Sequence, residues 1–75
     1  MDLERLIKMA NEIGGFFAQM PDREAAISAT AGHLRNFWEA RMRREISEYA
    51  RRDGEKLTEI ARAAVLTFET KSKTD

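Results

Sequence analysis

The single histidine, His33, is the side chain of this sequence best suited to acid–base chemistry. A histidine base needs a nucleophile within hydrogen-bond reach. Ser28 and Thr30 stand too few residues away on the same helix to face it squarely, and Ser47 could approach it only through the fold. We therefore interpret His33 as a boundary residue bonded to backbone or to an acid. A contact to a partner is the alternative, and catalysis is the least favoured role.

The sequence lacks metal-binding and phosphate-binding patterns. One His and no Cys leave only carboxylates as ligands, and no Asp- and Asn-rich loop has calcium-site spacing. Gly14-Gly15 falls inside a predicted helix, and no Gly-Lys-Ser/Thr triplet follows it, so it is not a phosphate-binding loop. We expect no catalytic residue, no metal and no cofactor in this chain.

Arginines cluster around an aromatic pair in the middle of the chain. The pair is Phe37-Trp38, and the arginines are Arg35, Arg41, Arg43, Arg44, Arg51 and Arg52. Helical spacing predicts the ion pairs Arg41–Glu45, Arg44–Glu48 and Glu48–Arg52. The simplest interpretation is a solvated face on which these arginines form ion pairs. The alternative is a face that docks on acidic residues of a partner protein. The third interpretation is a helix-turn-helix motif that binds DNA. For Trp38 we favour a place in the core over a binding role.

Composition limits the chain to one small domain. Its 75 residues are 43% apolar, but 11 of the apolar residues are alanine. A core of this size rarely supplies more than about 3–5 kcal/mol. A helix bundle with good local propensity could be stable alone, and docking on a larger partner would add to its stability.

Charge and hydropathy argue against two classes of partner. The 13 basic and 13 acidic residues give a formal net charge of zero, which counts against a nucleic-acid binder. No apolar run is long enough to span a membrane, and the amphipathic N-terminus has no signal-peptide pattern. We expect a cytoplasmic protein that does not contact membranes, and the absence of Cys agrees with that location.

Apolar periodicity predicts four helices with short connections and no β-strand. The expected helices cover residues 3–20, 22–37, 40–52 and 59–70. Their ends are marked by capping and turn residues, namely Asp2, Met20-Pro21, Trp38-Glu39, Asp53-Gly54 and Thr58. We predict an all-α, single-domain bundle of four short helices over residues 1–70, with the first two antiparallel and the last two closing the core around Trp38. Residues 71–75 are expected to form a disordered polar tail.

The first two helices have apolar or small-residue faces that a core of this size would not bury. The first helix has an apolar arc wide enough for more than one neighbour, and Met9 and Phe16 extend it on one side. Gly14 lies on this arc, where a missing side chain permits close approach. The side of the second helix away from its main stripe carries small residues, namely Ala25, Ala29, Gly32 and Asn36. Such a face can let another backbone approach closely.

Four blocks of residues carry a family resemblance. They are Arg5-Leu6-Ile7-Lys8-Met9-Ala10-Asn11-Glu12-Ile13-Gly14 with Phe16-Phe17, then Met20-Pro21-Asp22-Arg23, His33-Leu34-Arg35-Asn36-Phe37-Trp38 and Arg41-Met42-Arg43-Arg44. In this order and spacing the chain resembles the delta subunit of cytoplasmic NAD-dependent, molybdenum-containing formate dehydrogenases, closely over residues 1–46 and loosely over 53–66. The family usually has Pro where this chain has Ala40, which removes a stop for the preceding helix.

The resemblance implies a non-catalytic accessory subunit of a complex that converts formate and NAD to CO2 and NADH. In that family the alpha subunit holds a bis-molybdopterin-guanine-dinucleotide molybdenum centre and iron-sulfur clusters. The beta and gamma subunits carry electrons through further clusters and a flavin to NAD. The delta subunit binds no cofactor, and its implied role is assembly or stability of the complex. The larger subunits, chiefly alpha, are therefore the expected partners.

Which face docks is left open, as is the choice between a permanent structural subunit and an assembly factor acting during cofactor insertion. The candidate partner-binding residues are Met9, Phe16, Ala25, Ala29, Gly32, His33, Arg35, Asn36, Phe37, Trp38, Arg41 and Arg44. Two alternative functions also stay open: a small helical nucleic-acid-binding regulator, and a self-associating bundle that forms a homodimer in isolation.

Overall fold

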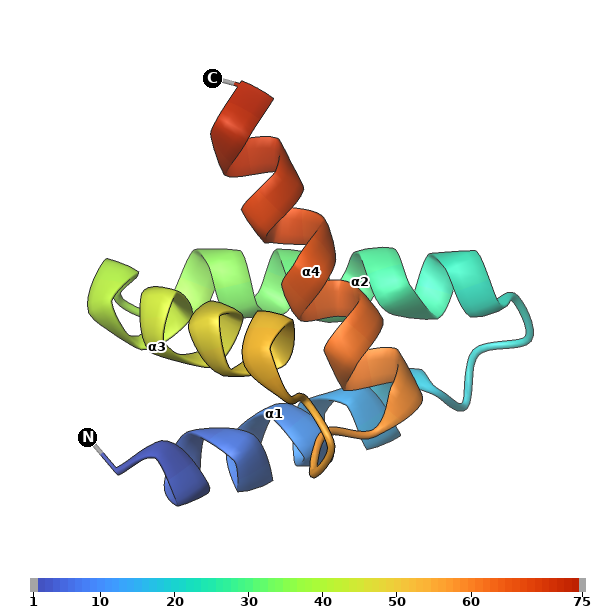
Figure 1. The fold of residues 1–75 in the computed structure, drawn as a ribbon. Coiled ribbons are helices and arrows are strands. Elements are labelled where there is room, and N and C mark those ends of the chain that lie inside the picture. The colour runs from blue at the N-terminus through green and yellow to red at the C-terminus, as the bar shows by residue number, and fades with distance from the viewer. Residues whose placement is uncertain (1, 75) are drawn as a thin grey trace.

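Four helices form the chain in the computed structural model, which describes the backbone of residues 2–74 and the side chains of residues 2–67 (Figure 1). They are α1 (Leu3–Phe17), α2 (Arg23–Phe37), α3 (Ala40–Arg52) and α4 (Glu59–Thr74). No strand occurs within residues 2–74, so the predicted all-α bundle is confirmed. Among the described residues, no helix has the length and apolar character needed to cross a membrane.

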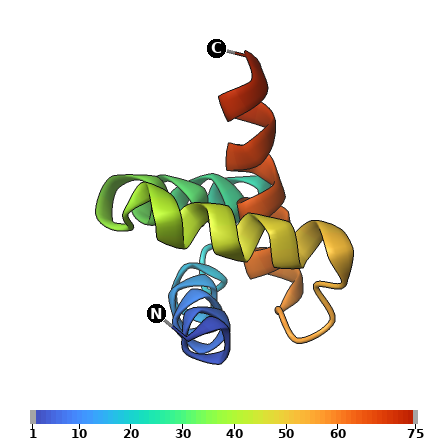
Figure 2. The ribbon, with the colours of Figure 1, turned by 60° about the vertical axis from the view of Figure 1, so that its left-hand side comes forward.

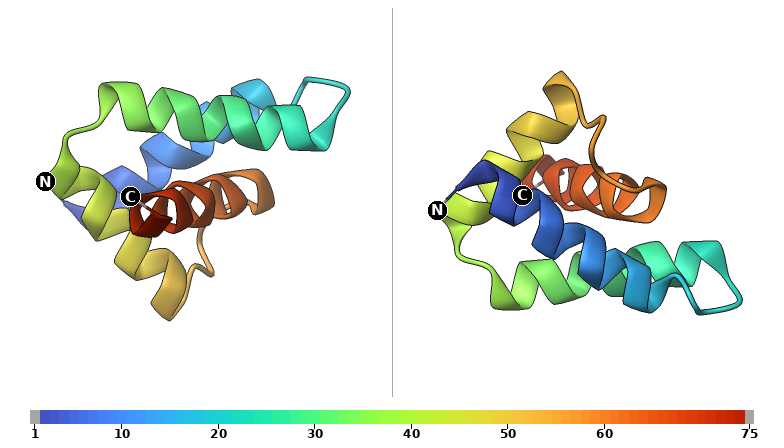
Figure 3. Two further views of the ribbon diagram at one scale, coloured as in Figure 1. Left: turned by 90° about the horizontal axis from the view of Figure 1, so that it is seen from above. Right: turned by 90° about the horizontal axis from the view of Figure 1, so that it is seen from below.

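α1 and α4 each pack against all three other helices, and α4 is the central one because its contacts are the more extensive. Figure 2 shows α1 nearly end-on below α3, with α4 crossing behind α3. Both views of Figure 3 show α1 and α2 running in opposite directions, as expected, and crossing obliquely. Gly14 permits close approach as predicted, because its missing side chain leaves room for the backbone of Ala61 on α4.

One apolar cluster joins all four helices. Its largest fully buried members include Leu6, Leu34, Ile46 and Val65, one from each helix. Trp38 belongs to the same cluster and keeps only 6% of its surface exposed, which confirms its expected place in the core. Little of this indole is left for a partner to contact.

The break between α2 and α3 forms without proline. Trp38 and Glu39 adopt extended backbone conformations, with φ/ψ of −97°/142° and −68°/157°. The Trp38 N–H still donates a hydrogen bond to the carbonyl oxygen of Leu34, with 2.9 Å between nitrogen and oxygen, and so completes the last turn of α2. Burial of the Trp38 indole stabilises this corner, so Ala40 can begin α3 without a proline.

Three helix boundaries differ from the predicted ones, and the smallest difference is at α2, which begins at Arg23 because Asp22 is its N-cap. α1 ends at Phe17 rather than at residue 20, and turn hydrogen bonds such as Met20 N–H to the carbonyl of Phe17, 3.0 Å, follow it. Pro21 contributes to the early end, because it has no amide N–H to donate to the carbonyl of Phe17 four residues earlier. α4 continues to Thr74 rather than ending at residue 70. The predicted disordered tail stays a prediction, because residue 75 and the side chains beyond Thr67 lie outside the described part.

The loop between α3 and α4 is held by a side chain from α1. Asn11 Nδ2 donates to the carbonyl oxygen of Lys56 at 2.9 Å, and Asn11 Oδ1 accepts from the Thr58 amide at 2.8 Å. The amide of Lys56 also donates to the Tyr49 hydroxyl at 2.9 Å. Gly54 makes the tight exit from α3 possible, since its φ of +65° is unfavourable for other residues.

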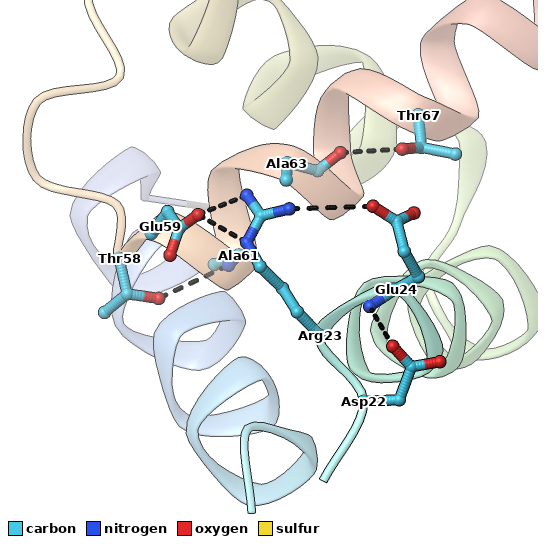
Figure 4. Close-up of polar contacts among 8 residues, drawn as sticks. All are labelled: Asp22, Arg23, Glu24, Thr58, Glu59, Ala61, Ala63 and Thr67. Carbon is cyan, nitrogen blue, oxygen red and sulfur yellow. Dashed lines mark hydrogen bonds and ion pairs between the residues drawn. The ribbon is translucent and has the colours of Figure 1, made fainter. Parts of the chain in front are cut away.

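A polar cluster joins the N-termini of α2 and α4 (Figure 4). Arg23 forms a hydrogen-bonded ion pair with Glu59 and a longer ion pair with Glu24, at 3.7 Å. The hydrogen bond to Glu59 raises the pKa of the Arg23 guanidinium above its ordinary value. Thr58 Oγ1 accepts from the Ala61 amide at 3.3 Å, which confirms Thr58 as the N-cap of α4.

Candidate docking surface

Four aromatic side chains, which we call the aromatic row, lie in sequence across the surface where α1 meets α2. Ring centroids are 5.0 Å apart between Phe16 and Phe17, 6.1 Å between Phe17 and His33, and 4.8 Å between His33 and Phe37. The two inner rings are half-buried. The two outer rings, Phe16 and Phe37, are 67% and 73% exposed.

Local sequence accounts for the positions of these rings. His33 and Phe37 are four residues apart on α2 and therefore lie on the same side of that helix. Phe16 and Phe17 close the last turn of α1, and Phe17 turns inward against His33 while Phe16 remains outside. Each outer phenylalanine would contribute about 1.5–3 kcal/mol if a partner buried it fully.

A small open pocket lies beside the aromatic row. Its volume is about 250 Å³, and its lining residues are Glu12, Ile13, Phe16, Phe17 and His33. This volume is below the roughly 300–1,000 Å³ of sites that hold small-molecule ligands. Only Glu12 among the five lining residues carries a formal charge, and its side chain is exposed.

His33 is half-buried, as expected of a boundary residue, but its environment differs from the predicted one. The ring lies between Phe17 and Phe37, and its Nδ1 atom is shielded from solvent. Within the described residues, Nδ1 has no hydrogen-bond partner, so the predicted bond to backbone or an acid is not made by this atom. Aromatic packing holds the imidazole in place instead.

The small-residue face of α2 is open. Ala25, Ala29 and Gly32 are half-buried and Asn36 is exposed. A Cβ atom built at Gly32 would meet no heavy atom within 4 Å. Among the described residues nothing else occupies the space next to this Cβ position, so Gly32 is accessible to a partner.

The predicted ion pairing along α3 is wrong. The ion pairs formed within residues 2–67 include Arg23–Glu24, Arg23–Glu59 and Lys56–Glu4, and none of the three predicted pairs is among them. Arg41 and Arg44 are instead exposed and unpaired within the described part of the chain. The guanidinium of Arg52 lies 5.9 Å from the centre of the Tyr49 ring.

The structure separates the candidate partner-binding residues into groups. Phe16, His33 and Phe37 come together in the aromatic row. Met9 packs against the core and is half-buried, and Arg35 is half-buried with its Nη1 atom shielded from solvent. Sequence reasoning missed the pocket residues Glu12, Ile13 and Phe17. Their only signal was proximity to Phe16 along one helix, which does not show that α2 completes the pocket.

Possible metal ligands do not gather in this fold. Within the described residues, no group of three or more His, Asp or Glu side chains is placed to hold a metal ion, and the sequence has no Cys. With no Cys in the sequence, the chain offers no thiolate of the kind that holds iron-sulfur clusters.

Fold and surface together define a small all-α domain with an exposed aromatic face. Residues 5–65 match the family of NADH-dependent formate dehydrogenase delta subunits, FdsD, and the chain belongs to this family. No curated protein and no solved structure matches the chain significantly. The family confirms the resemblance drawn from the four blocks of residues, and it makes the chain part of an enzyme complex that contains other formate dehydrogenase subunits.

Proposed function

We propose that the chain is a non-catalytic accessory subunit of an NAD-dependent, molybdenum-containing formate dehydrogenase. It docks on the larger subunits, chiefly the alpha subunit, and supports assembly or stability of the complex in the cytoplasm. The chain carries no cofactor, and the molybdenum centre, iron-sulfur clusters and flavin belong to the partner subunits. Membership of the delta-subunit family supports the identity of the complex.

The exposure of Phe16 and Phe37 carries the proposed docking role. Burial of both rings would contribute about 3–6 kcal/mol before the costs of association. A core of this size rarely contributes more than about 3–5 kcal/mol, so docking can change the stability of the delta chain by an amount comparable to its own folding. Aromatic residues, phenylalanine among them, are also enriched in the cores of protein interfaces.

A pull-down of the tagged chain from its native cytosol tests this proposal. The larger subunits should co-elute, and the eluate should reduce NAD when formate is added. Recovery of the chain alone, or with nucleic acid, would contradict the proposal and favour the nucleic-acid-binding or self-associating alternatives.

Assembly and stability are distinguished by preparing the complex with and without the delta chain. An assembly role predicts a lower molybdenum content per alpha subunit in freshly purified complex without delta. A stability role predicts equal molybdenum content but faster loss of formate-dependent NAD reduction on warming. Equal content and equal half-life would contradict both roles.

Self-association is the second candidate, because the same two phenylalanines could meet on a two-fold axis. Sedimentation of the isolated chain at micromolar concentration tests it. A monomeric mass would remove this candidate, whereas a dimer that dissociates when alpha is added would show that both partners use one surface.

A further inference from the structure

We propose that the pocket beside the aromatic row receives an arginine side chain from a larger formate dehydrogenase subunit, with the cation against the aromatic rings and paired with Glu12. This inference rests on the proposed docking function and names the chemistry that the docking site recognises. It concerns the five residues that line the pocket, namely Glu12, Ile13, Phe16, Phe17 and His33.

The dimensions of the pocket suit one side chain. Its volume of about 250 Å³ is too small for a typical cofactor and its mouth is open to solvent. The pocket lies between α1 and α2, and both helices present an exposed phenylalanine near it. A partner segment that covers these phenylalanines would bring one of its side chains to the pocket.

The electrostatics of the lining favour a cation. Aromatic rings carry negative faces that attract guanidinium and ammonium groups. Glu12 adds a carboxylate, and no Lys or Arg lines the pocket. Within the described residues Glu12 forms no ion pair, and Lys8, one turn earlier on α1, is not joined to it.

Other occupants fit less well. A carboxylate from the partner would meet Glu12 with like charge, which is unfavourable. A purely apolar side chain would fill the pocket but leave the exposed Glu12 carboxylate without a partner from the docking subunit. Between the two cations, arginine is favoured, because its planar guanidinium can stack on a ring while donating two hydrogen bonds to one carboxylate.

Calorimetric titration of the larger subunits, purified without delta, with the full-length chain tests the inference. Phe16→Ala should weaken binding about tenfold to thirtyfold, because it removes an exposed aromatic anchor. Glu12→Gln should weaken binding about threefold at low salt, and the loss should shrink at high salt. Glu12→Lys should weaken binding further, because it places like charges together.

Two control variants match these changes. Glu48→Gln removes an exposed, unpaired carboxylate on α3, and Met20→Ala removes an apolar side chain, 39% exposed, that does not line the pocket. Both should bind as the unaltered chain does. Circular dichroism melts of every variant would show that the fold is retained, which is expected because the altered side chains are exposed.

Each outcome separates this inference from the proposed function. Loss of affinity in Phe16→Ala with no effect of Glu12→Gln or salt would overturn the cationic occupant in favour of an apolar one. Unchanged affinity in all variants would overturn the pocket while leaving the docking function intact. Failure of the unaltered chain to bind the larger subunits would overturn the docking function itself.

Discussion

Gly14 lies so close to Ala61 that a Cβ atom at position 14 would come within 3.3 Å of the Ala61 backbone nitrogen. This approach brings α1 onto the first turn of the central helix α4. Gly15 is adjacent in sequence, but a Cβ atom there would meet nothing within 4 Å. The two glycines therefore have the same helix propensity, but Gly14 packs closely against α4 whereas Gly15 faces open space.

Substitution of the two glycines should change stability in opposite directions. Gly14→Val should destabilise the chain by about 1–3 kcal/mol, because the larger side chain has to separate α1 from α4. Gly15→Ala should stabilise it by about 0.5–1 kcal/mol, because alanine is the better helix former and the site is open. Urea denaturation measures both. Destabilisation of equal size at the two positions would show that α1 does not approach α4 this closely.

Removal of the Asn11 side-chain amide should release the loop before α4. Asn11→Ala loses one hydrogen bond to Lys56 and one from Thr58, so the free energy of unfolding should fall by about 1–3 kcal/mol. Asn11→Asp keeps the acceptor near the N-terminus of α4 and should lose less. The exposed amide of Asn36 supplies the control, since Asn36→Ala should change stability by no more than about 0.5 kcal/mol. Hydrogen exchange at the Thr58 amide would report the release directly.

The sequence predicts the features of this fold that depend on local signals. Helix α3 matches its predicted bounds, and Thr58 caps α4 as expected, because capping and periodicity are properties of neighbouring residues. Trp38 was also placed correctly in the core.

Features that depend on distant contacts were missed. The hydrogen-bond partners of Asn11 lie 45 and 47 residues away along the chain, where helical periodicity gives no signal. The predicted pair Arg41–Glu45 is absent from the described ion pairs, because helical spacing permits an exposed pair without making it favourable. Likewise, the sequence identified Phe16 and Phe37 as contacts, but only the fold shows that they share one surface.

The Arg23–Glu59 pair should stabilise the junction of α2 and α4 in a salt-dependent way. Arg23→Met should lower the melting temperature in dilute buffer, and the difference should shrink in molar salt, because exposed ion pairs are screened. The raised pKa of Arg23 gives the sign of the pH effect. A pKa that is higher in the folded than in the unfolded chain adds stability at every pH below the unfolded-state pKa, and this stability is lost as the pH rises through the folded-state pKa. The contribution of the Arg23 guanidinium should therefore persist from neutral into alkaline solution. A melting-temperature difference that disappears just above neutral pH would contradict this assignment.

Substitutions of Phe37 and Trp38, which are adjacent at the end of α2, should affect binding and folding differently. Phe37 is 73% exposed but its ring packs against His33, so Phe37→Ser should lower the free energy of unfolding by no more than about 1.5 kcal/mol. It should weaken binding to the larger formate dehydrogenase subunits about tenfold or more, because it removes one end of the aromatic row. Trp38→Ala removes a buried indole and should cost about 3–5 kcal/mol, enough to unfold most of the isolated chain.

The two variants are compared by circular dichroism of the isolated chain and by pull-down of the larger subunits. Phe37→Ser should remain helical and lose the partner, whereas Trp38→Ala should lose helical signal first and bind only to the extent that the partner restores its fold. Retention of the partner by folded Phe37→Ser would place the docking surface elsewhere. The open face around Gly32 and the unpaired Arg41 and Arg44 would then be the next surfaces to test, because they are accessible in the same structure.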